Sequence, residues 1–182
     1  VMRDRFGIAI AGTHGKSTTT SMTAFAMVDN GLDPSFVIGG GVPQLGGNSH
    51  SGRGEAFVVE ACEYDRSFHQ LWPRVAVVTN VEAEHLDVYR DLDGEVRCAG
   101  ATVAVLRPSI PGAHNLLNAT CALAACVAGG LDASAAADSI SRFLGVERRM
   151  SEVGRYNGAI VVDDYGHHPT EIRVTLDALR QK

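Results

Sequence analysis

The strongest constraint on the fold is a short apolar run that leads through a glycine-rich turn into a helical pattern. Residues 8–11 are apolar, and the segment after them reads Gly12-Thr13-His14-Gly15-Lys16-Ser17-Thr18. Glycines let backbone N–H groups turn inward around an anion, and a helix start adds unpaired donors and partial positive charge. A strand that turns into a helix at Gly-Lys-Ser therefore predicts a phosphate-binding loop, in which Lys16 neutralises phosphate oxygens and Ser17 offers its hydroxyl to Mg²⁺.

The predicted loop is shorter than the general pattern G-x-x-x-x-G-K-[ST], because Ile10 occupies the position five before Gly15. The alternative is an ordinary glycine-rich connection with an incidental lysine. The strand pattern before the loop and the helix pattern after it favour phosphate binding.

The rest of the chain alternates short apolar runs with helical stretches, a pattern typical of an α/β fold with a mostly parallel sheet and flanking helices. Hydrophobic residues make up 45% of the sequence, which is enough for a buried core. The predicted strands are residues 8–11, 56–60, 75–79, 102–106 and 159–163. The predicted helices are residues 17–30, 115–128, 133–144 and 170–179. The seven glycines between residues 39 and 54 predict a loop.

Polar residues follow three of these strands, at the sheet edge where open α/β sheets place their ligands. Glu60 ends one strand, His85 lies shortly after the next, and Asp164 and His167 follow the last. Carboxylates at this edge suit a divalent cation bound to phosphates. Taken alone, Glu60 could sit in a solvated loop, while Asp164 and His167 could cap a helix.

The segment from Gly112 to Ala119 contains His114, Asn115 and Asn118. Amides can donate and accept at the polar edge of a flat heterocycle, and an imidazole can stack on its face. The alternative is a helix start capped by asparagine.

Charge and cysteine content narrow the function classes. The formal net charge of −5 lacks the basic surplus that binds nucleic acid or an anionic membrane, so neither partner is expected. The four cysteines form no C-x-x-C pair, which argues against a zinc site and a disulfide scaffold and fits a reducing cytoplasm.

Six segments occur together in an order that resembles the Mur ligase family. They read AGTHGKSTTT, VVEACEYDRSF, VVTNVEAEH, GAHNLLNA, GVERRM and VVDDYGHHPTE. The resemblance implies that Lys16 and the backbone of residues 13–17 hold the ATP phosphates, that Ser17 and Glu60 coordinate Mg²⁺, and that His85 binds a second Mg²⁺.

The resemblance also assigns the remaining candidates. It implies adenine contacts for His114, Asn115 and Asn118, a γ-phosphate contact for Arg149, a ribose contact for Asp164, and an approach to the substrate carboxylate or the incoming amino acid for His167. It further implies a catalytic set consisting of Lys16, Glu60, His85, Arg149 and His167.

Within the family, GTHGK and DDYGHHP point to the member that uses ATP to join L-alanine to UDP-N-acetylmuramate through an acyl phosphate. Two alternatives stay open: a Mg-ATP-binding module without ligase activity, and a sibling ligase that adds a recycled tripeptide to the same sugar nucleotide. The resemblance predicts a central ATP-binding domain over residues 1–145, shortened between 90 and 111, and the start of a C-terminal ligase domain over residues 146–182. Because the family carries further domains at both ends, this chain is expected to be a fragment.

Overall fold

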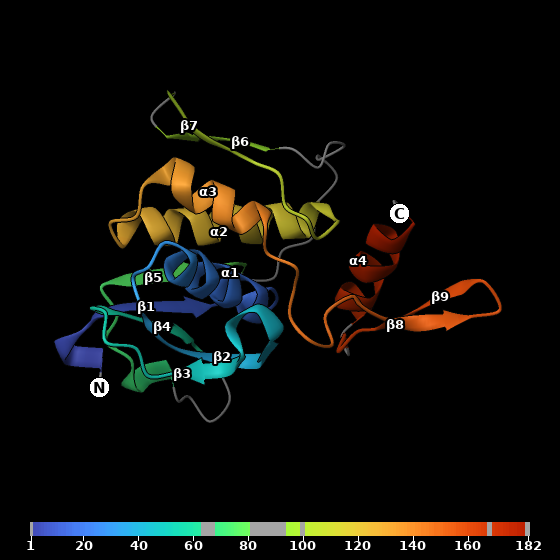
Figure 1. Cartoon of the computed structure of the whole chain (residues 1–182), viewed down its shortest axis with the longest axis horizontal. Helices are drawn as coiled ribbons and strands as arrows, with labels where there is room; N and C mark the ends of the chain where they lie inside the picture. The colour runs from blue at the N-terminus through green and yellow to red at the C-terminus, as the bar shows by residue number, and fades with distance from the viewer. Residues whose placement is uncertain (1, 63–67, 81–93, 99–100, 167–168, 181–182) are drawn as a thin grey trace.

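The computed structural model describes residues 2–62, 68–80, 94–98, 101–166 and 169–180, and confirms the predicted α/β class. The main sheet contains β1 (Phe6–Ala11), β2 (Ser35–Val42), β3 (Gly47–His50), β4 (Ala56–Glu60) and β5 (Val75–Val78). Helices α1 (Lys16–Asp29) and α2 (Ala113–Ala128) lie on one face of this sheet, and α3 (Ala133–Ser141) packs on both of them (Figure 1). Two short 3₁₀ turns, η1 (Met2–Asp4) and η2 (Pro43–Leu45), complete this part of the chain.

Strand β1 lies inside the sheet, whose order is β3-β2-β4-β1-β5. It pairs in parallel with β4 on one side and with β5 on the other, while β3 alone runs antiparallel. Ile8 and Ile10 are fully buried, as expected for a strand covered on both faces. The register places Ile10 opposite Glu60 and Ala11 opposite Val78, so three strands end around the segment that follows β1.

Helix α1 is rich in threonine and serine, yet most of it is buried. Its hydroxyls hydrogen-bond to backbone carbonyls one turn earlier in the same helix. Thr20 donates to the carbonyl of Lys16 at 2.7 Å, and Thr23 donates to that of Thr19 at 2.8 Å. These bonds let a polar helix pack in the core.

The main core lies between the sheet and the three helices. It includes Met22 from α1, Leu123 from α2 and Ile140 from α3, all almost completely buried. Phe143 packs on Phe25 with 5.8 Å between ring centroids. The helices are therefore held to the sheet mainly by apolar burial.

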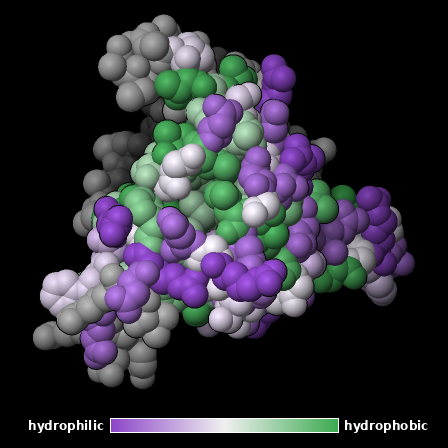
Figure 2. Space-filling view, turned by 60° about the vertical axis from the view of Figure 1, so that its left-hand side comes forward, coloured by the Kyte–Doolittle hydropathy of each residue, from purple (hydrophilic) through white to green (hydrophobic). Residues whose placement is uncertain are grey.

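The opposite face of the sheet carries a smaller cluster, formed by Met2, Ala9, Val59 and Ala61. Other hydrophobic side chains stay exposed, among them Val78 on β5 and Val103 on β7 (Ala101–Leu106). Figure 2 shows hydrophobic side chains gathered in the middle of one face of the molecule, with polar ones around them. Among the residues that the structure describes, no helix combines the length and apolar content needed to cross a bilayer.

The predicted loop over residues 39–54 is wrong in part, because β2 continues through Gly39, Gly40 and Gly41 and β3 follows at Gly47–His50. Glycine is needed at these three positions because side chains of other segments approach the backbone closely, and not because the chain turns there. A Cβ on Gly39 would lie 2.8 Å from a Glu60 oxygen, and one on Gly41 would lie 2.2 Å from a Glu147 oxygen.

Two other expectations need correction. The strand predicted at 102–106 exists as β7 (Ala101–Leu106), but it pairs antiparallel with β6 (Gly94–Cys98) in a separate hairpin above α3 (Figure 1). Helix α3 ends at Ser141 rather than at residue 144. The reason is that the backbone tightens there, with the N–H of Phe143 bonded to the carbonyl of Ile140, so that the Phe143 ring enters the core.

The C-terminal part consists of the antiparallel pair β8 (Ser151–Tyr156) and β9 (Ala159–Asp163), followed by α4 (Pro169–Leu179). Figure 1 shows this part beside the helical layer, with the β8–β9 hairpin extending away from it. Strand β9 and helix α4 match their predicted positions. Strand β8 was not predicted, because its sequence mixes charged and glycine residues and its side chains are mostly exposed.

The neighbours Phe143 and Leu144 allow a test of the core. We expect Phe143→Ala to lower the free energy of unfolding by about 3–5 kcal/mol, because it leaves a cavity between α1 and α3. Leu144→Ala should change it by less than about 0.5 kcal/mol, because the side chain is 72% exposed. Urea denaturation followed by circular dichroism measures both, and equal losses would contradict this description of the core.

Candidate functional site

The predicted phosphate loop lies between β1 and α1, at the carboxyl edge of the sheet. Gly12 and Gly15 adopt φ angles of 133° and 80°, which strongly favour glycine. Gly15 is the N-cap of α1 and supplies no side chain to bond the amides of the first turn. The amides of this first turn are the donors that a helix start offers to an anion.

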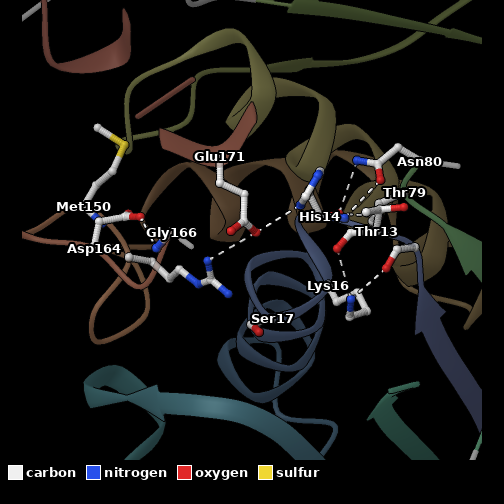
Figure 3. A network of polar contacts seen from close by, with 12 residues as sticks. Thr13, His14, Lys16, Ser17, Thr79, Asn80, Met150, Asp164, Gly166 and Glu171 are labelled. Atoms are coloured by element: carbon white, nitrogen blue, oxygen red, sulfur yellow. Dashed lines mark hydrogen bonds and ion pairs between the residues drawn. The ribbon is translucent and has the colours of Figure 1, made fainter. Parts of the chain in front are cut away.

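The two residues that follow β5 hold this loop in place. Thr79 Oγ1 lies 2.6 Å from the carbonyl oxygen of His14, and Asn80 Oδ1 accepts the His14 N–H at 3.0 Å (Figure 3). A Cβ on Gly12 would meet Thr79 Oγ1 at 2.2 Å, so the contact requires glycine there. Thr79 and Asn80 were not among the predicted site residues, although both lie in the VVTNVEAEH segment.

The side chain of Lys16 lies along the loop. Its Nζ donates to the carbonyl oxygens of Gly12 at 2.7 Å and of Thr13 at 3.1 Å (Figure 3). The ammonium group is thus kept beside the amides of the loop, where an anion would need it.

Glu60 is not in a solvated loop. It ends β4, and both of its carboxylate oxygens are bonded: Ser17 Oγ donates to Oε1 at 3.0 Å, and the N–H of Gly39 donates to Oε2 at 2.7 Å. Two ligands bound side by side at about 2.1 Å from one Mg²⁺ ion lie about 3 Å apart. The separation of Ser17 and Glu60 therefore fits a shared hard cation.

No group of three histidine, cysteine or acidic side chains able to hold a metal occurs in the described part of the chain. A cation at Ser17 and Glu60 would thus need further ligands, such as phosphate oxygens and water. The other predicted metal ligand, His85, and the predicted catalytic residue His167 lie outside the described residues.

Helix α2 begins beside the loop. Asn118 is buried, and its Oδ1 lies 2.3 Å from where a Cβ on Gly15 would be. The alternative of an asparagine cap is wrong, because the N-cap of α2 is Gly112. The side-chain amide of Asn115 instead donates to the carbonyl of Pro111 at 2.7 Å. Both asparagines thus lie inside the helix, and Asn118 lies against the predicted phosphate loop.

His114 lies in the first turn of α2. Burial lowers the pKa of His114 to about 4, although the nearby Asp164 carboxylate acts in the opposite direction. The imidazole is therefore neutral at pH 7.

Asp164 follows β9 and does not cap a helix, because α4 begins only at Pro169. Its carboxylate accepts the N–H groups of Met150 at 2.8 Å and of Gly166 at 2.7 Å (Figure 3). The bond from Met150 joins the segment after β9 to the segment that carries Arg149.

Arg149 reaches the phosphate loop through a residue that sequence reasoning missed. Glu171 of α4 contacts Arg149 Nη1 at 3.9 Å and His14 Nδ1 at 2.9 Å (Figure 3). The only sequence signal for Glu171 was its place at the end of the VVDDYGHHPTE segment. The structure therefore places Lys16, Ser17, Glu60 and Asn118 at the loop, and it links Arg149 to the loop through Glu171.

Comparisons with known proteins identify the family of this chain. The Mur ligase middle domain matches residues 10–99, and the Mur ligase glutamate ligase domain matches residues 148–182. Two curated relatives are UDP-N-acetylmuramate–L-alanine ligases. The one from Desulfitobacterium hafniense is 34% identical over 99% of this chain and 54% of its own length, and the one from Solibacter usitatus is 37% identical over 100% and 52%.

Solved structures give the same result. A murein peptide ligase from Psychrobacter arcticus has a TM-score of 0.77 at 27% identity, covering 100% of this chain and 56% of its own. A UDP-N-acetylmuramate–alanine ligase from Thermotoga maritima shares the fold, with a TM-score of 0.83 at 24% identity over 98% of this chain and 54% of its own.

The chain spans about half the length of the curated relatives it matches. The two alignments run over 242 and 245 residues, more than the 182 of this chain, so the relatives carry additional residues inside the aligned stretch. The matched domains, the relatives and the geometry of the loop lead to one conclusion: the chain belongs to the Mur ligase family.

Proposed function

We propose that this chain binds Mg-ATP and forms the nucleotide-binding part of an enzyme that joins L-alanine to UDP-N-acetylmuramate. The observation that carries the proposal is the contact between Ser17 at the start of α1 and Glu60 at the end of β4. It puts a hydroxyl and a carboxylate beside a phosphate-type loop that also contains Lys16.

The proposed reaction has two steps. A carboxylate is a poor acyl donor, so the carboxylate oxygen of UDP-N-acetylmuramate first attacks the γ-phosphorus of ATP and ADP leaves. The amine of L-alanine then attacks the acyl carbon, and the C–O bond to phosphate breaks, which releases inorganic phosphate and a proton. In such a transfer the protein acts by positioning and by neutralising charge on the moving phosphoryl group.

Each residue has a role in this proposal. The amides at the start of α1 and the Lys16 ammonium hold the phosphates, while Arg149 neutralises the γ-phosphate. The segment with His114, Asn115 and Asn118 receives the adenine, and Asp164 the ribose. The neutral imidazole of His114 suits stacking against an uncharged base.

A divalent cation fits this site, because Ser17 and Glu60 offer hard oxygen ligands at the right separation. When bound, Mg²⁺ supplies charge neutralisation between phosphate oxygens. Gly39 fixes the Glu60 carboxylate through its N–H, so the ligand is oriented before any cation arrives. His85 is proposed to hold a second Mg²⁺, and His167 to approach the substrate.

A second candidate is a sibling ligase that adds a tripeptide to the same sugar nucleotide. The likeness to a murein peptide ligase at 27% identity favours it, while the curated relatives at 34% and 37% favour L-alanine. Phosphate release that requires UDP-N-acetylmuramate and L-alanine would support the first function, and a preference for tripeptide over alanine would support the second. ATP binding without either turnover would support a binding module.

We place the reaction in the cytoplasm. Among the cysteines whose side chains the structure describes, Cys121 and Cys126 carry free thiols, which fits a reducing compartment. Burial raises the pKa of the Cys126 thiol to about 12, so this group stays protonated and unreactive.

Removing the lysine of the loop tests phosphate binding. We expect Lys16→Ala to weaken Mg-ATP binding by about 30-fold or more, because it deletes the ammonium group from a site built for an anion. Arg53→Ala is the control, since that side chain is 97% exposed and its Nε pairs with Asp33 Oδ2 at 3.6 Å. Isothermal titration calorimetry measures both, and unchanged affinity in Lys16→Ala would contradict the assignment of the loop.

Changing the carboxylate that faces Ser17 tests the cation site. Glu60→Gln should weaken Mn²⁺ binding, measured by electron paramagnetic resonance in the presence of ATP, by about 10-fold or more. Gly39→Ala should act in the same direction, because its Cβ would lie 2.8 Å from Oε2 and displace the carboxylate. Glu55→Gln, an exposed residue next to the start of β4, serves as the matched control and should bind Mn²⁺ like the wild type.

The buried histidine predicts a pH dependence of stability. The pKa of His114 is about 4 in the folded chain and about 6.5 when unfolded, so between these values the unfolded chain binds the extra proton. His114 should therefore lower the free energy of unfolding by about 1.4 kcal/mol per pH unit as pH falls from 6.5 to 4. Urea denaturation at several pH values should show a shallower slope for His114→Gln, and identical slopes would mean that the imidazole is not buried uncharged.

A further inference from the structure

Glu171 joins three segments that are distant in the sequence. Its Oε1 atom lies 2.9 Å from Nδ1 of His14 in the phosphate loop and 3.9 Å from Nη1 of Arg149 in the segment after α3 (Figure 3). Glu171 itself belongs to the first turn of α4. One carboxylate oxygen therefore links the loop, the arginine segment and the C-terminal helix.

The Glu171 contact is largely shielded from water. The Glu171 side chain is 14% exposed and that of His14 is 22% exposed, so the interaction is screened less than a surface pair. Because a carboxylate only accepts hydrogen bonds, Nδ1 of His14 must carry the proton in this bond. The contact thus fixes the orientation of the imidazole.

His14 is a firm anchor for this link. Asn80 accepts its N–H at 3.0 Å, and Thr79 Oγ1 lies 2.6 Å from its carbonyl oxygen. A side chain bonded to His14 is therefore tied to the end of β5 and, through the loop, to β1. Because Glu171 belongs to α4, its bond to His14 also ties the start of α4 to the loop.

The long side chain of Arg149 can adopt many rotamers, so its orientation depends on the groups that it contacts. Its guanidinium carbon lies 5.5 Å from the centre of the Tyr165 ring, so the ring and the Glu171 carboxylate are two partners that direct it. The neighbouring Arg148 and Met150 both have positive φ angles, of 59° and 51°, which shows that the backbone around Arg149 is tightly turned.

We propose that Glu171 is a positioning residue, which ties Arg149 to the phosphate loop through His14 so that the guanidinium faces the terminal phosphate of ATP. This inference rests on the proposed function. A carboxylate near phosphates would by itself repel them, so a favourable effect of Glu171 on binding can arise only through the cations and donors that it orients.

The test compares nucleotides that differ in the terminal phosphate. Glu171→Gln keeps the shape of the side chain and removes its charge. We expect it to weaken ATP binding by about 5-fold to 10-fold and ADP binding by less than about 2-fold, measured by calorimetry with Mg²⁺. Asp177→Asn makes the same chemical change on the same helix, at an exposed ion pair with Arg180, and should bind both nucleotides like the wild type.

A second measurement examines the link itself. In the double variant His14→Ala/Glu171→Gln, the loss of ATP affinity should be smaller than the combined losses of the two single variants, because they remove one shared contact. Additive losses would overturn the proposal.

Three other outcomes would also overturn it. Equal weakening of ATP and ADP would indicate a structural role for Glu171, and tighter ATP binding would identify the carboxylate as a competing anion. Failure of the wild-type chain to bind either nucleotide would refute the proposed function, and the present inference with it.

Discussion

The parallel pairing of β1 with β4 and β5 is the constraint on which the rest of the structure depends. Ile8 and Ile10 are fully buried, and the ladders on both sides leave β1 a single register. Because parallel strands end at the same edge, this register brings Glu60 and Thr79 to the segment that leaves β1. The phosphate loop is therefore assembled by three strands rather than by its own sequence alone.

The site is built from groups that are oriented before any ligand is present. Gly39 fixes Glu60, Thr79 and Asn80 fix the backbone of His14, and Lys16 lies along the carbonyls of the loop. Preorganised donors and charges need little rearrangement when phosphates bind, which is the property that phosphoryl transfer requires. The proposed role of Glu171 extends the same principle to Arg149, because it adds a contact from the C-terminal helix to the loop.

The glycine run at residues 39–41 shows why local patterns mislead. Glycines are common in turns, so the sequence predicted a loop, but here they belong to β2 and leave room for Glu60, Val146 and Glu147. A close approach between distant segments leaves no local signal. The same applies to β7, which has the composition of a buried strand yet pairs in a separate hairpin with β6.

The sequence by itself determined the α/β class, the bounds of β4 and β9, most helix ends to within about two residues, and the glycine-rich turn between β1 and α1 that is proposed to bind phosphates. These features follow from local periodicity, glycine placement and the rule that ligands gather at the carboxyl ends of parallel strands. The predicted roles of His85 and His167 stay predictions. Only the tertiary structure decided that Asn80 holds the loop, that Asn118 faces Gly15 and that Glu171 reaches His14, 157 positions earlier in the chain. Side chains so far apart in sequence meet only after the core has packed, because their contacts depend on strand register and helix placement that no local pattern contains.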